Sequence, residues 1–256
     1  MWPKNVLVTA ANGDLAEAVS GVLEDAFPNT NIFGCESGNL WPAKVIINNV
    51  TKVPRGDAEN YIVAIKKIVD QFNIDLVIPC SDPELVRFAS AKRNKELDFK
   101  ILMSSPEIID IFSDKYLGAE WLRKHNIGSP KTTLLSTASV TDLPLIAKPR
   151  SGSGSLGVYK VRTPELLEGL KSEYGDSYVS QEYLDVDDQE YTCALFQSNN
   201  ISRILILHRR LDAGKTIEAK IIKNIEIELL LMNLIKIIDL NGLLNVQLRL
   251  TDKGPK

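Results

Sequence analysis

The sequence contains little cysteine. Its 256 residues include three cysteines, Cys35, Cys80 and Cys193, which lie far apart and show no C-x-x-C spacing. Zinc sites and disulfide frameworks need several cysteines at suitable spacings. The scarcity argues against both, and we expect a protein of the reducing cytoplasm, with a cytoplasmic location.

Long apolar runs are also missing. The first residues, MWPKNVLVTAANGDL, have no apolar core like that of a secretory signal peptide. The most apolar stretch, ELLLMNLIKII at 228–238, is interrupted by Asn233 and Lys236 and is too short to cross a bilayer. We therefore expect no membrane partner and interpret this stretch as a buried helix.

A basic excess is absent as well. The chain has 30 Lys and Arg residues against 33 Asp and Glu residues, which gives a net charge of -3. Proteins whose main partner is a nucleic acid usually carry a basic patch and a positive balance. The composition thus predicts no nucleic-acid partner and favours small-molecule ligands. With 44% hydrophobic residues, the chain can build ordinary globular cores.

The first hundred residues of the sequence show alternating strand and helix signals. Short apolar runs predict strands at 5–9, 31–36, 75–80 and 100–105, and amphipathic segments predict helices at 15–27, 57–72 and 83–97. Strands that alternate with helices and are apolar throughout are typical of a parallel sheet covered on both faces. We predict an α/β, Rossmann-like domain over residues 1–112.

The regular alternation of predicted strands and helices ends after residue 112. A helix is predicted at 113–126, then closely spaced strands, a helix at 163–174, further strands from 178 to 222, an apolar helix at 225–240 and a final strand at 244–250. Neighbouring strands without intervening helices favour antiparallel pairing. This part is predicted to be α+β and distinct from the first domain.

A glycine-rich segment lies within this second part. Residues 146–158 read IAKPRSGSGSLGV and contain G-x-G-x-x-G at Gly152, Gly154 and Gly157. A dinucleotide fingerprint would open directly into a helix, whereas here the β-prone Val158–Val161 follows and the next helix signal starts only at Thr163. The loop is therefore predicted to join strand to strand, as a lid over a nucleotide does. A protein kinase is disfavoured, because no D-F-G or H-R-D follows.

Several side chains could serve a triphosphate, which needs cations, backbone amides and ligands for Mg²⁺. Lys115 stands at a helix start and Lys148 on the strand that enters the glycine loop, while Asn245, Gln247 and Arg249 share one face of a strand. Taken alone, Lys115 is also consistent with a solvated cation at the start of a helix, and Glu190 is also consistent with part of a solvated acidic turn. Arg209 and Arg210 have two alternative interpretations: they contact a phosphate, or they are solvated at the end of a strand. His125 and His208 are interpreted as structural.

Four segments, in this order and spacing, resemble the ATP-grasp superfamily, most closely its carbamoyl-phosphate-synthase-like ATP-binding proteins: DKYLGAEWLRKHNIGSP, LIAKPRSGSGSLGV, VSQEYLDVDDQEYT and GLLNVQLRL. The resemblance also covers the first part, including VIPCSDPEL at 77–85. It implies a Rossmann-like pre-ATP-grasp domain at 1–112, a small lobe with the glycine-rich lid at 113–180 and a large lobe at 181–256.

The resemblance also implies roles for individual residues, with ATP and Mg²⁺ as cofactors. Lys115 and Lys148 would contact the phosphates. Residues 151–157 would form the lid, the hinge strand would read adenine largely through its backbone, Glu190 would bind the ribose and Gln247 would help to hold Mg²⁺. The lid residues concerned are Gly152, Gly154, Ser155 and Gly157, and the hinge residues are Gln181, Glu182, Tyr183 and Leu184.

One part of the family pattern is missing. Relatives carry a metal-binding E-x-N motif on a further strand, and this sequence stops at 251–256 before such a motif. We therefore expect an ATP-grasp fold that is truncated at its C-terminus and binds ATP better than it turns it over. A missing strand would also expose an apolar edge near Leu243, Leu244 and Val246, which favours association, for example as a homodimer.

The function implied by the resemblance is that of an ATP-dependent carboxylate ligase. Such enzymes phosphorylate a carboxylate, and an amine or similar nucleophile attacks the acyl phosphate. Phosphoryl transfer relies on positioning and charge neutralisation, so no catalytic side chain is named. The alternatives are a nucleotide-binding module without turnover and one part of a split carbamoyl-phosphate-synthase-like enzyme. A Rossmann dehydrogenase is disfavoured, because the first turn, TAANGDL, has one glycine where the fingerprint has three.

Overall fold

The computed structural model describes residues 2–152, 156–186, 189–199, 201–212, 215–238 and 240–256. Within it the chain forms two compact units, Met1–Ile109 and Asp110–Lys256.

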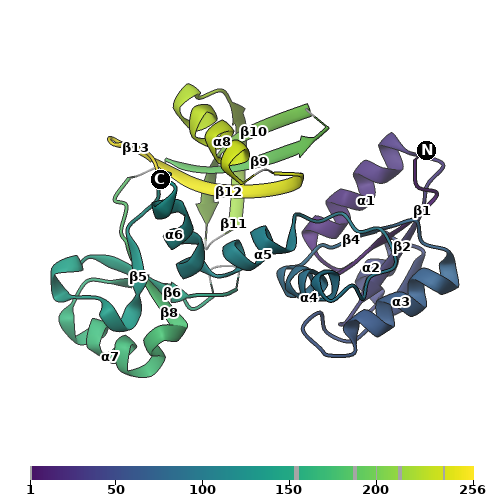
Figure 1. The fold of residues 1–256 in the computed structure, drawn as a ribbon, viewed down its shortest axis with the longest axis horizontal. Helices are drawn as coiled ribbons and strands as arrows, with labels where there is room; N and C mark the ends of the chain where they lie inside the picture. The colour runs from purple at the N-terminus through teal and green to yellow at the C-terminus, as the bar shows by residue number, and fades with distance from the viewer. Residues whose placement is uncertain (1, 153–155, 187–188, 200, 213–214, 239) are drawn as a thin grey trace. The chain divides into compact units, whose positions relative to one another are not determined.

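The first unit is built on a parallel sheet (Figure 1). Its strands lie in the order β3-β2-β1-β4, and all three strand pairs are parallel. The strands are β1 (Asn5–Val8), β2 (Asn31–Glu36), β3 (Asn49–Lys52) and β4 (Leu76–Ile78). The helices are α1 (Asp14–Ala26), α2 (Trp41–Lys44), α3 (Tyr61–Phe72) and α4 (Asp82–Arg93). The Rossmann-like parallel architecture predicted for this part is confirmed.

Strand β1 shows why both faces of this sheet are covered. Val6, Leu7 and Val8 are completely buried. Successive strand side chains point to opposite faces, so a continuous apolar run needs a packing partner on each side. Leu7 belongs to the core cluster that contains residues of α3 and α4, whereas Val6 and Val8 belong to the cluster that contains Ala16 and Leu23 of α1.

Several predicted boundaries in this unit differ from the structure. Strand β3 was not predicted, because its sequence NVTK is short, has one apolar residue in four and carries no apolar run. The helix predicted from residue 57 begins at Tyr61, and the helix predicted to residue 97 ends at Arg93. The strand predicted at 100–105 is reduced to a single parallel bridge between Val77 and Ile101. Local periodicity gives an element's existence more reliably than its ends.

The second unit begins with two helices and a small antiparallel sheet. The helices are α5 (Pro106–Ser113) and α6 (Lys115–Lys124). The sheet has the order β5-β8-β6-β7 and consists of β5 (Thr132–Leu134), β6 (Leu145–Pro149), β7 (Tyr159–Val161) and β8 (Tyr178–Glu182), with helix α7 (Pro164–Tyr174) between β7 and β8 in the chain. Strands β6 and β7 are antiparallel neighbours. The glycine-rich loop therefore joins strand to strand, as the sequence predicted.

A larger antiparallel sheet follows, with the order β11-β10-β9-β12-β13. Its strands are β9 (Glu190–Ser198), β10 (Ile201–Asp212), β11 (Lys215–Ile222), β12 (Gly242–Thr251) and β13 (Gly254–Pro255), and helix α8 (Ile225–Ile237) precedes β12. Helix α8 contacts β9 and β10 and buries Ile227, Leu231, Leu234 and Ile235. The expected α+β character of this part is confirmed. Among the described residues, no helix combines the length and the apolar character that a bilayer crossing requires.

Candidate functional site: two lysines beside a glycine-rich loop

Lys148 lies on β6, the strand that leads into the glycine-rich loop. Its ammonium group donates a hydrogen bond to the side-chain oxygen of Gln181 at 2.7 Å, and Gln181 in turn donates from its amide nitrogen to the hydroxyl of Thr132 at 2.9 Å. Burial, together with the positive charge of Lys115, lowers the pKa of Lys148 to about 8. A cation that has lost part of its hydration next to a second cation is a strong attractor of anions.

Lys115 is the second cation and is the first residue of α6. The helix is capped by Asp114, whose carboxylate accepts hydrogen bonds from the backbone N–H groups of Tyr116 and Leu117. The ammonium group of Lys115 donates to the carbonyl of Gly152 at 2.8 Å and to that of Arg150 at 3.4 Å. Lys115 is thereby held against the start of the glycine-rich loop.

Arg150 fixes this arrangement. Its guanidinium group donates to both carboxylate oxygens of Asp114, with the closest nitrogen–oxygen distance at 2.5 Å, and the Lys115 N–H donates to the Arg150 carbonyl at 2.9 Å. Paired guanidinium–carboxylate hydrogen bonds are strong and directional. The start of α6 and the end of β6 are therefore joined, which places the two lysines close together.

The described glycines of the loop adopt backbone conformations that other residues avoid. Gly152 has φ +110° and Gly157 has φ +69°. A Cβ atom at Gly157 would lie 2.6 Å from the Tyr178 hydroxyl oxygen and 3.2 Å from Pro149, whereas one at Gly152 would meet open space. Gly154 and Ser155, also predicted to bind nucleotide, lie outside the described residues.

The predicted hinge, Gln181 to Leu184, leaves the end of β8. Gln181 is paired on both sides, with β5 and β6, whereas Glu182 is paired with β6, and its carboxylate accepts hydrogen bonds from Lys256 at 2.8 and 2.9 Å. The ring of Tyr183 lies under the ammonium group of Lys160, 3.6 Å from its centroid. The Leu184 carbonyl accepts from Arg249 at 3.0 Å. Several polar groups of the segment thus already have protein partners.

Glu190, predicted to bind ribose, lies between two arginines. One carboxylate oxygen accepts from Arg209 at 3.0 Å, and the other accepts from Arg249 at 2.8 and 3.0 Å. The Glu190 side chain is 21% exposed and that of Arg209 is 11% exposed. In this arrangement the Glu190 carboxylate orients both guanidinium groups. To contact a ribose, the carboxylate would have to separate from one of the two arginines.

Gln247, predicted to help hold Mg²⁺, is an exposed residue of β12 opposite Thr192 of β9. Its neighbour Asn245 accepts a hydrogen bond from the Thr192 hydroxyl at 2.9 Å. Within the described ranges, no three His, Cys, Asp or Glu side chains come together as metal ligands would. Around Gln247, the chain thus offers a metal ion neutral amides and a hydroxyl.

The sequence left open whether Arg209 and Arg210, on the hairpin of β10 and β11, contact a phosphate or are solvated. His208, Arg209, Arg210, Glu218 and Lys220 line a small hollow of about 110 Å³. Arg210 and Lys220 both pair with Glu218, at 3.3 Å each. Cross-strand register brings these residues together, and the sequence alone shows only the Arg209–Arg210 pair.

The side-chain role of Gln181 was missed as well. It was predicted to act through its backbone as part of a hinge, yet its amide bridges Lys148 and Thr132. Alternation along β8 could have indicated this, because a glutamine that follows Tyr178, Val179 and Ser180 in a buried strand has to satisfy its amide inside the sheet. The lysine pair, the loop and Gln181 together form a cationic, partly desolvated site suited to a polyphosphate.

Protein-family models match both parts of the chain. A model described as an ATP-grasp domain matches residues 112–256, and a model described as a PylC-like N-terminal domain matches residues 6–102. The first match alone covers more than half of the chain. The two matches correspond to the antiparallel and the parallel parts of the fold.

Individual relatives are distant. An uncharacterized protein of Mycoplasma pneumoniae is 21% identical over 145 residues, which cover 54% of this chain and 50% of that protein, so the chain spans about half the length of this curated relative. Among solved structures, N5-carboxyaminoimidazole synthetase from Staphylococcus aureus complexed with ADP has a TM-score of 0.74 at 14% identity, covering 98% of this chain and 68% of that one. The L-amino acid ligase from Bacillus licheniformis has a TM-score of 0.67 at 17% identity, covering 98% and 65%. These likenesses show a shared fold.

Proposed function

The chain belongs to the ATP-grasp family, and on that basis we propose that it provides the nucleotide site of an ATP-dependent carboxylate ligase. The γ-phosphoryl group of ATP would pass to a carboxylate, giving an acyl phosphate and ADP. An amine, or a similar nucleophile, would then attack the acyl carbon and release phosphate. The substrates are thus a small carboxylic acid and an amine.

The observation that carries this proposal is that Lys148 is a partly buried cation under the influence of a second cation, Lys115. The pKa of Lys148 is lowered to about 8 by burial and by Lys115. Keeping two ammonium groups close together costs free energy, and a bound polyphosphate would recover that cost. Backbone N–H groups of a glycine-rich loop are the usual complement to such cations around phosphate oxygens.

The remaining site residues have supporting roles in the proposal. Residues 113–180 would act as the small lobe and 181–256 as the large lobe, with the loop that contains Gly152, Gly154, Ser155 and Gly157 as the lid. Adenine would be read next to Tyr183, through its backbone and the Leu184 N–H. Glu190 would reach the ribose after release from Arg209 or Arg249.

Mg²⁺ would accompany the nucleotide, because it neutralises phosphate charge in phosphoryl transfer. The described residues do not make a magnesium site by themselves, since Gln247 brings one neutral amide to it. The ion would therefore depend on phosphate oxygens and water for most of its ligands. The three free cysteines suit a reducing cytoplasm as the location.

A second candidate function is nucleotide binding without turnover. It is favoured by the partners of Glu190, whose carboxylate forms ion pairs with both Arg209 and Arg249. The two functions share the lysine pair and differ only in whether ADP is released.

Calorimetric titration with ATP and Mg²⁺ tests the shared part of both. In Lys148→Met the affinity should fall roughly tenfold or more, because a charge-assisted hydrogen bond of about 1.5–3 kcal/mol is lost. Lys124→Met is the matched control, because Lys124 is an exposed lysine at the end of α6. Equal affinities for the two variants would refute the assignment of Lys148.

Release of ADP separates the two functions. The chain is incubated with ATP, Mg²⁺ and a panel of amino acids and other small carboxylic acids, with and without an amine. Release that depends on a carboxylate and is lost in Lys148→Met supports a ligase. Tight nucleotide binding without release for any member of the panel supports the binding module.

A further inference from the structure

The ammonium group of Lys160 lies against an aromatic ring. Lys160 is an exposed residue of β7, and its Nζ lies over the ring of Tyr183, 3.6 Å from the ring centroid. The π face of a ring attracts a positive charge but leaves the N–H donors of an ammonium group available to a stronger acceptor. None of the ion pairs formed between described residues includes Lys160. Its donors can therefore turn to a ligand.

Strand pairing places Lys160 on the same face of the small sheet as Lys148. Ile146 on β6 pairs with Lys160 on β7 and with Gln181 on β8. Residues directly opposite each other in neighbouring strands point to the same face. Lys148 comes two residues after Ile146, so it also points to this face, in agreement with its hydrogen bond to Gln181. One face thus carries Lys148, then Ile146, with Lys160 beside it.

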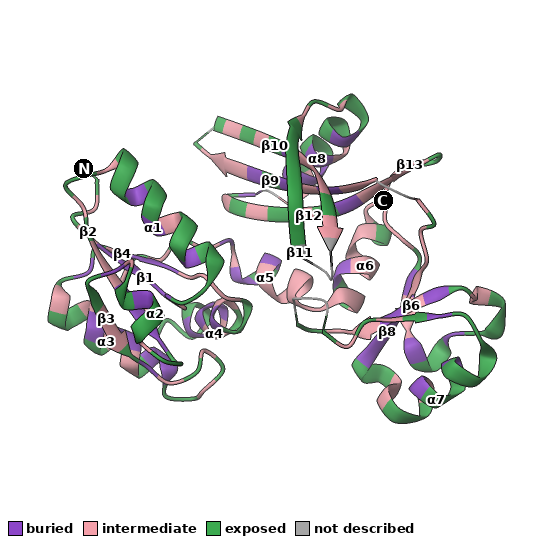
Figure 2. Cartoon of the chain, turned by 180° about the vertical axis from the view of Figure 1, so that it is seen from behind, coloured by how far each residue is buried: buried purple, intermediate pink, exposed green. Residues whose placement is uncertain are grey.

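The opposite face of this sheet packs against helix α7. Leu145 and Ala147, which alternate with Ile146 and Lys148 along β6, are buried in one cluster with Leu167 of α7. Figure 2 shows buried residues on β6 and on α7. Because α7 covers that face, a ligand of this sheet has to bind on the face that carries the lysines.

Under the proposed function, on which the present inference rests, the nucleotide lies along this face. With the phosphates bound by Lys115 and Lys148, the base would lie further along the face, over the half-buried Ile146 and next to Tyr183. Lys160 would then stand at the edge of the base that faces the hinge. This edge of a purine includes its C6 substituent.

Two acceptors near this end of the site already have protein partners. The Leu184 carbonyl accepts a hydrogen bond from Arg249 at 3.0 Å, and the Glu182 carboxylate accepts from Lys256 at 2.8 and 2.9 Å. Each acceptor therefore has a cation beside it, which repels the partly positive hydrogens of an amino group. The Lys160 ammonium group and the Leu184 N–H add donors. The polar groups next to the base thus favour an acceptor on the ligand.

Purine bases differ at this edge. Adenine carries an amino group at C6, which donates hydrogen bonds, whereas 6-oxopurines such as guanine carry an oxygen there, which accepts them. The oxygen could receive hydrogen bonds from both Lys160 and the Leu184 N–H, and the bond from the ammonium group would be charge-assisted. An amino group would meet the same donors with its own hydrogens.

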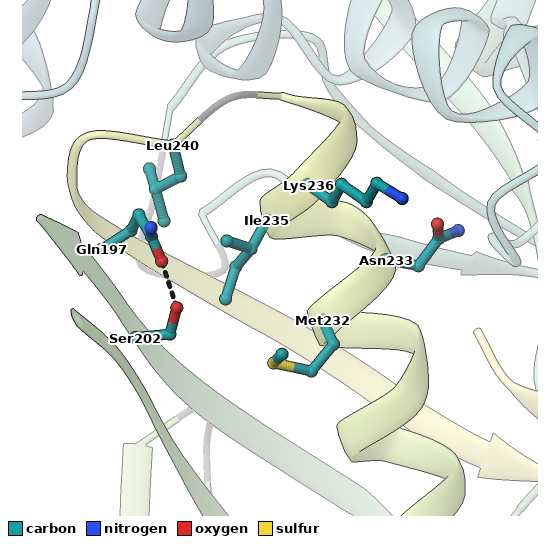
Figure 3. Close-up of a pocket in the computed structure, with 7 residues that line it drawn as sticks. All are labelled: Gln197, Ser202, Met232, Asn233, Ile235, Lys236 and Leu240. Atoms are coloured by element: carbon teal, nitrogen blue, oxygen red, sulfur yellow. Dashed lines mark hydrogen bonds between the residues drawn. The ribbon is translucent and has the colours of Figure 1, made fainter. Parts of the chain in front are cut away.

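A cavity elsewhere in the second unit does not compete for the base. It has a volume of about 460 Å³, and Figure 3 shows Ile235 and Leu240 in its wall together with the hydrogen-bonded pair Gln197 and Ser202. Gln197 and Glu190 are an odd number of positions apart on β9, so their side chains point to opposite faces of the large sheet. The cavity therefore lies on the α8 side, away from the residue proposed to bind ribose.

We propose that the nucleotide site accepts 6-oxopurine nucleoside triphosphates as well as ATP, and that Lys160 is the residue that admits them. Lys160 would donate to the oxygen at C6, while Lys148 and Lys115 hold the phosphates of either nucleotide in the same way. A site that reads adenine through an unoccupied carbonyl would reject such an oxygen, because two acceptors would face each other.

Calorimetric titrations with ATP and with inosine triphosphate, each with Mg²⁺, test the proposal, because these nucleotides differ only at C6 and N1 of the base. For the wild-type chain the two dissociation constants should agree within about tenfold. In Lys160→Met the affinity for inosine triphosphate should fall roughly tenfold or more, since a charge-assisted hydrogen bond is lost, whereas ATP should bind within about threefold of wild type. Lys124→Met, which removes an exposed lysine at the end of α6, is the matched control and should change neither affinity.

The ratio of the two dissociation constants separates the outcomes. A wild-type ratio within about tenfold that shifts against inosine triphosphate in Lys160→Met, and not in Lys124→Met, supports the proposal. Binding of ATP with inosine triphosphate more than about tenfold weaker overturns it and leaves the proposed function intact. So does a ratio that Lys160→Met leaves unchanged. A chain that binds neither nucleotide refutes the proposed function and this inference together.

Discussion

The ammonium group of Lys148 on β6 is hydrogen-bonded to the side chain of Gln181 on the neighbouring strand β8, at 2.7 Å. A neutral amide is a weak partner for a partly buried cation, which leaves most of the lysine's charge available to a ligand. The identity of residue 181 should therefore control how strongly the site attracts an anion.

The first prediction concerns Gln181→Glu. The new carboxylate would pair with Lys148, raise the pKa of the lysine and neutralise the charge that a phosphate would use. ATP affinity should fall roughly tenfold or more while the fold is kept. Titration calorimetry measures the affinity. Gln181→Met serves as the neutral control, and an equal loss in both variants would mean that the hydrogen bond, and not the charge, is what matters.

The second prediction concerns pH. The pKa of Lys148 is about 8, lowered from its usual value by burial and by Lys115. The lysine is mostly charged below pH 8 and neutral above it, so nucleotide affinity should be nearly constant from pH 6.5 to 7.5 and should weaken as the pH rises beyond about 8. In Lys148→Met this decline should disappear. A wild-type profile that stays flat to pH 9.5 would show that Lys148 does not bind the ligand.

The third prediction compares glycines. Gly157→Ala should destabilise the second unit by roughly 1–3 kcal/mol, because φ is +69° and the new Cβ would meet the Tyr178 hydroxyl. Gly169 lies inside α7 with no atom within 4 Å of an added Cβ. Gly169→Ala should therefore stabilise by about 0.5–1 kcal/mol. Urea unfolding measures both changes, and the two variants should differ in sign.

The fourth prediction concerns Asp114. Burial raises its pKa, but hydrogen bonds from Arg150 and from the N–H groups of Leu117 and Tyr116 outweigh this and lower it overall. An acid with a lowered pKa in the folded state stabilises the fold above its unfolded pKa, near 4, and loses that contribution as the pH falls through the folded pKa.

Asp114→Ala should therefore cost roughly 1–3 kcal/mol at pH 7, through the lost helix cap and the lost Arg150 pair. Asp114→Asn should recover the cap but not the pair. Unfolding curves at pH 7 and pH 3 check this, and a destabilisation by Asp114→Ala that is equally large at pH 3 would contradict the role of the charge.

The sequence by itself determined the fold class and the local character of the site. Continuous apolar runs such as β1 indicated a sheet covered on both faces, and the β-prone residues after Gly157 showed that the glycine-rich loop joins two strands. Lys148 could be found because an isolated cation in an apolar strand is unusual. These features follow from residues that are neighbours in the chain.

Only the tertiary structure decided which charges meet. Glu190 is paired with Arg249 across β9 and β12, Glu182 with Lys256, and Lys115 with the carbonyl of Gly152. The shifted pKa of Lys148 likewise arises from burial and from Lys115, which lies on another element. Strand register and helix packing set these contacts, and residues far apart in sequence leave no periodic signal of them. Periodicity predicts which segments form, whereas electrostatics depends on distances that exist only once they have packed.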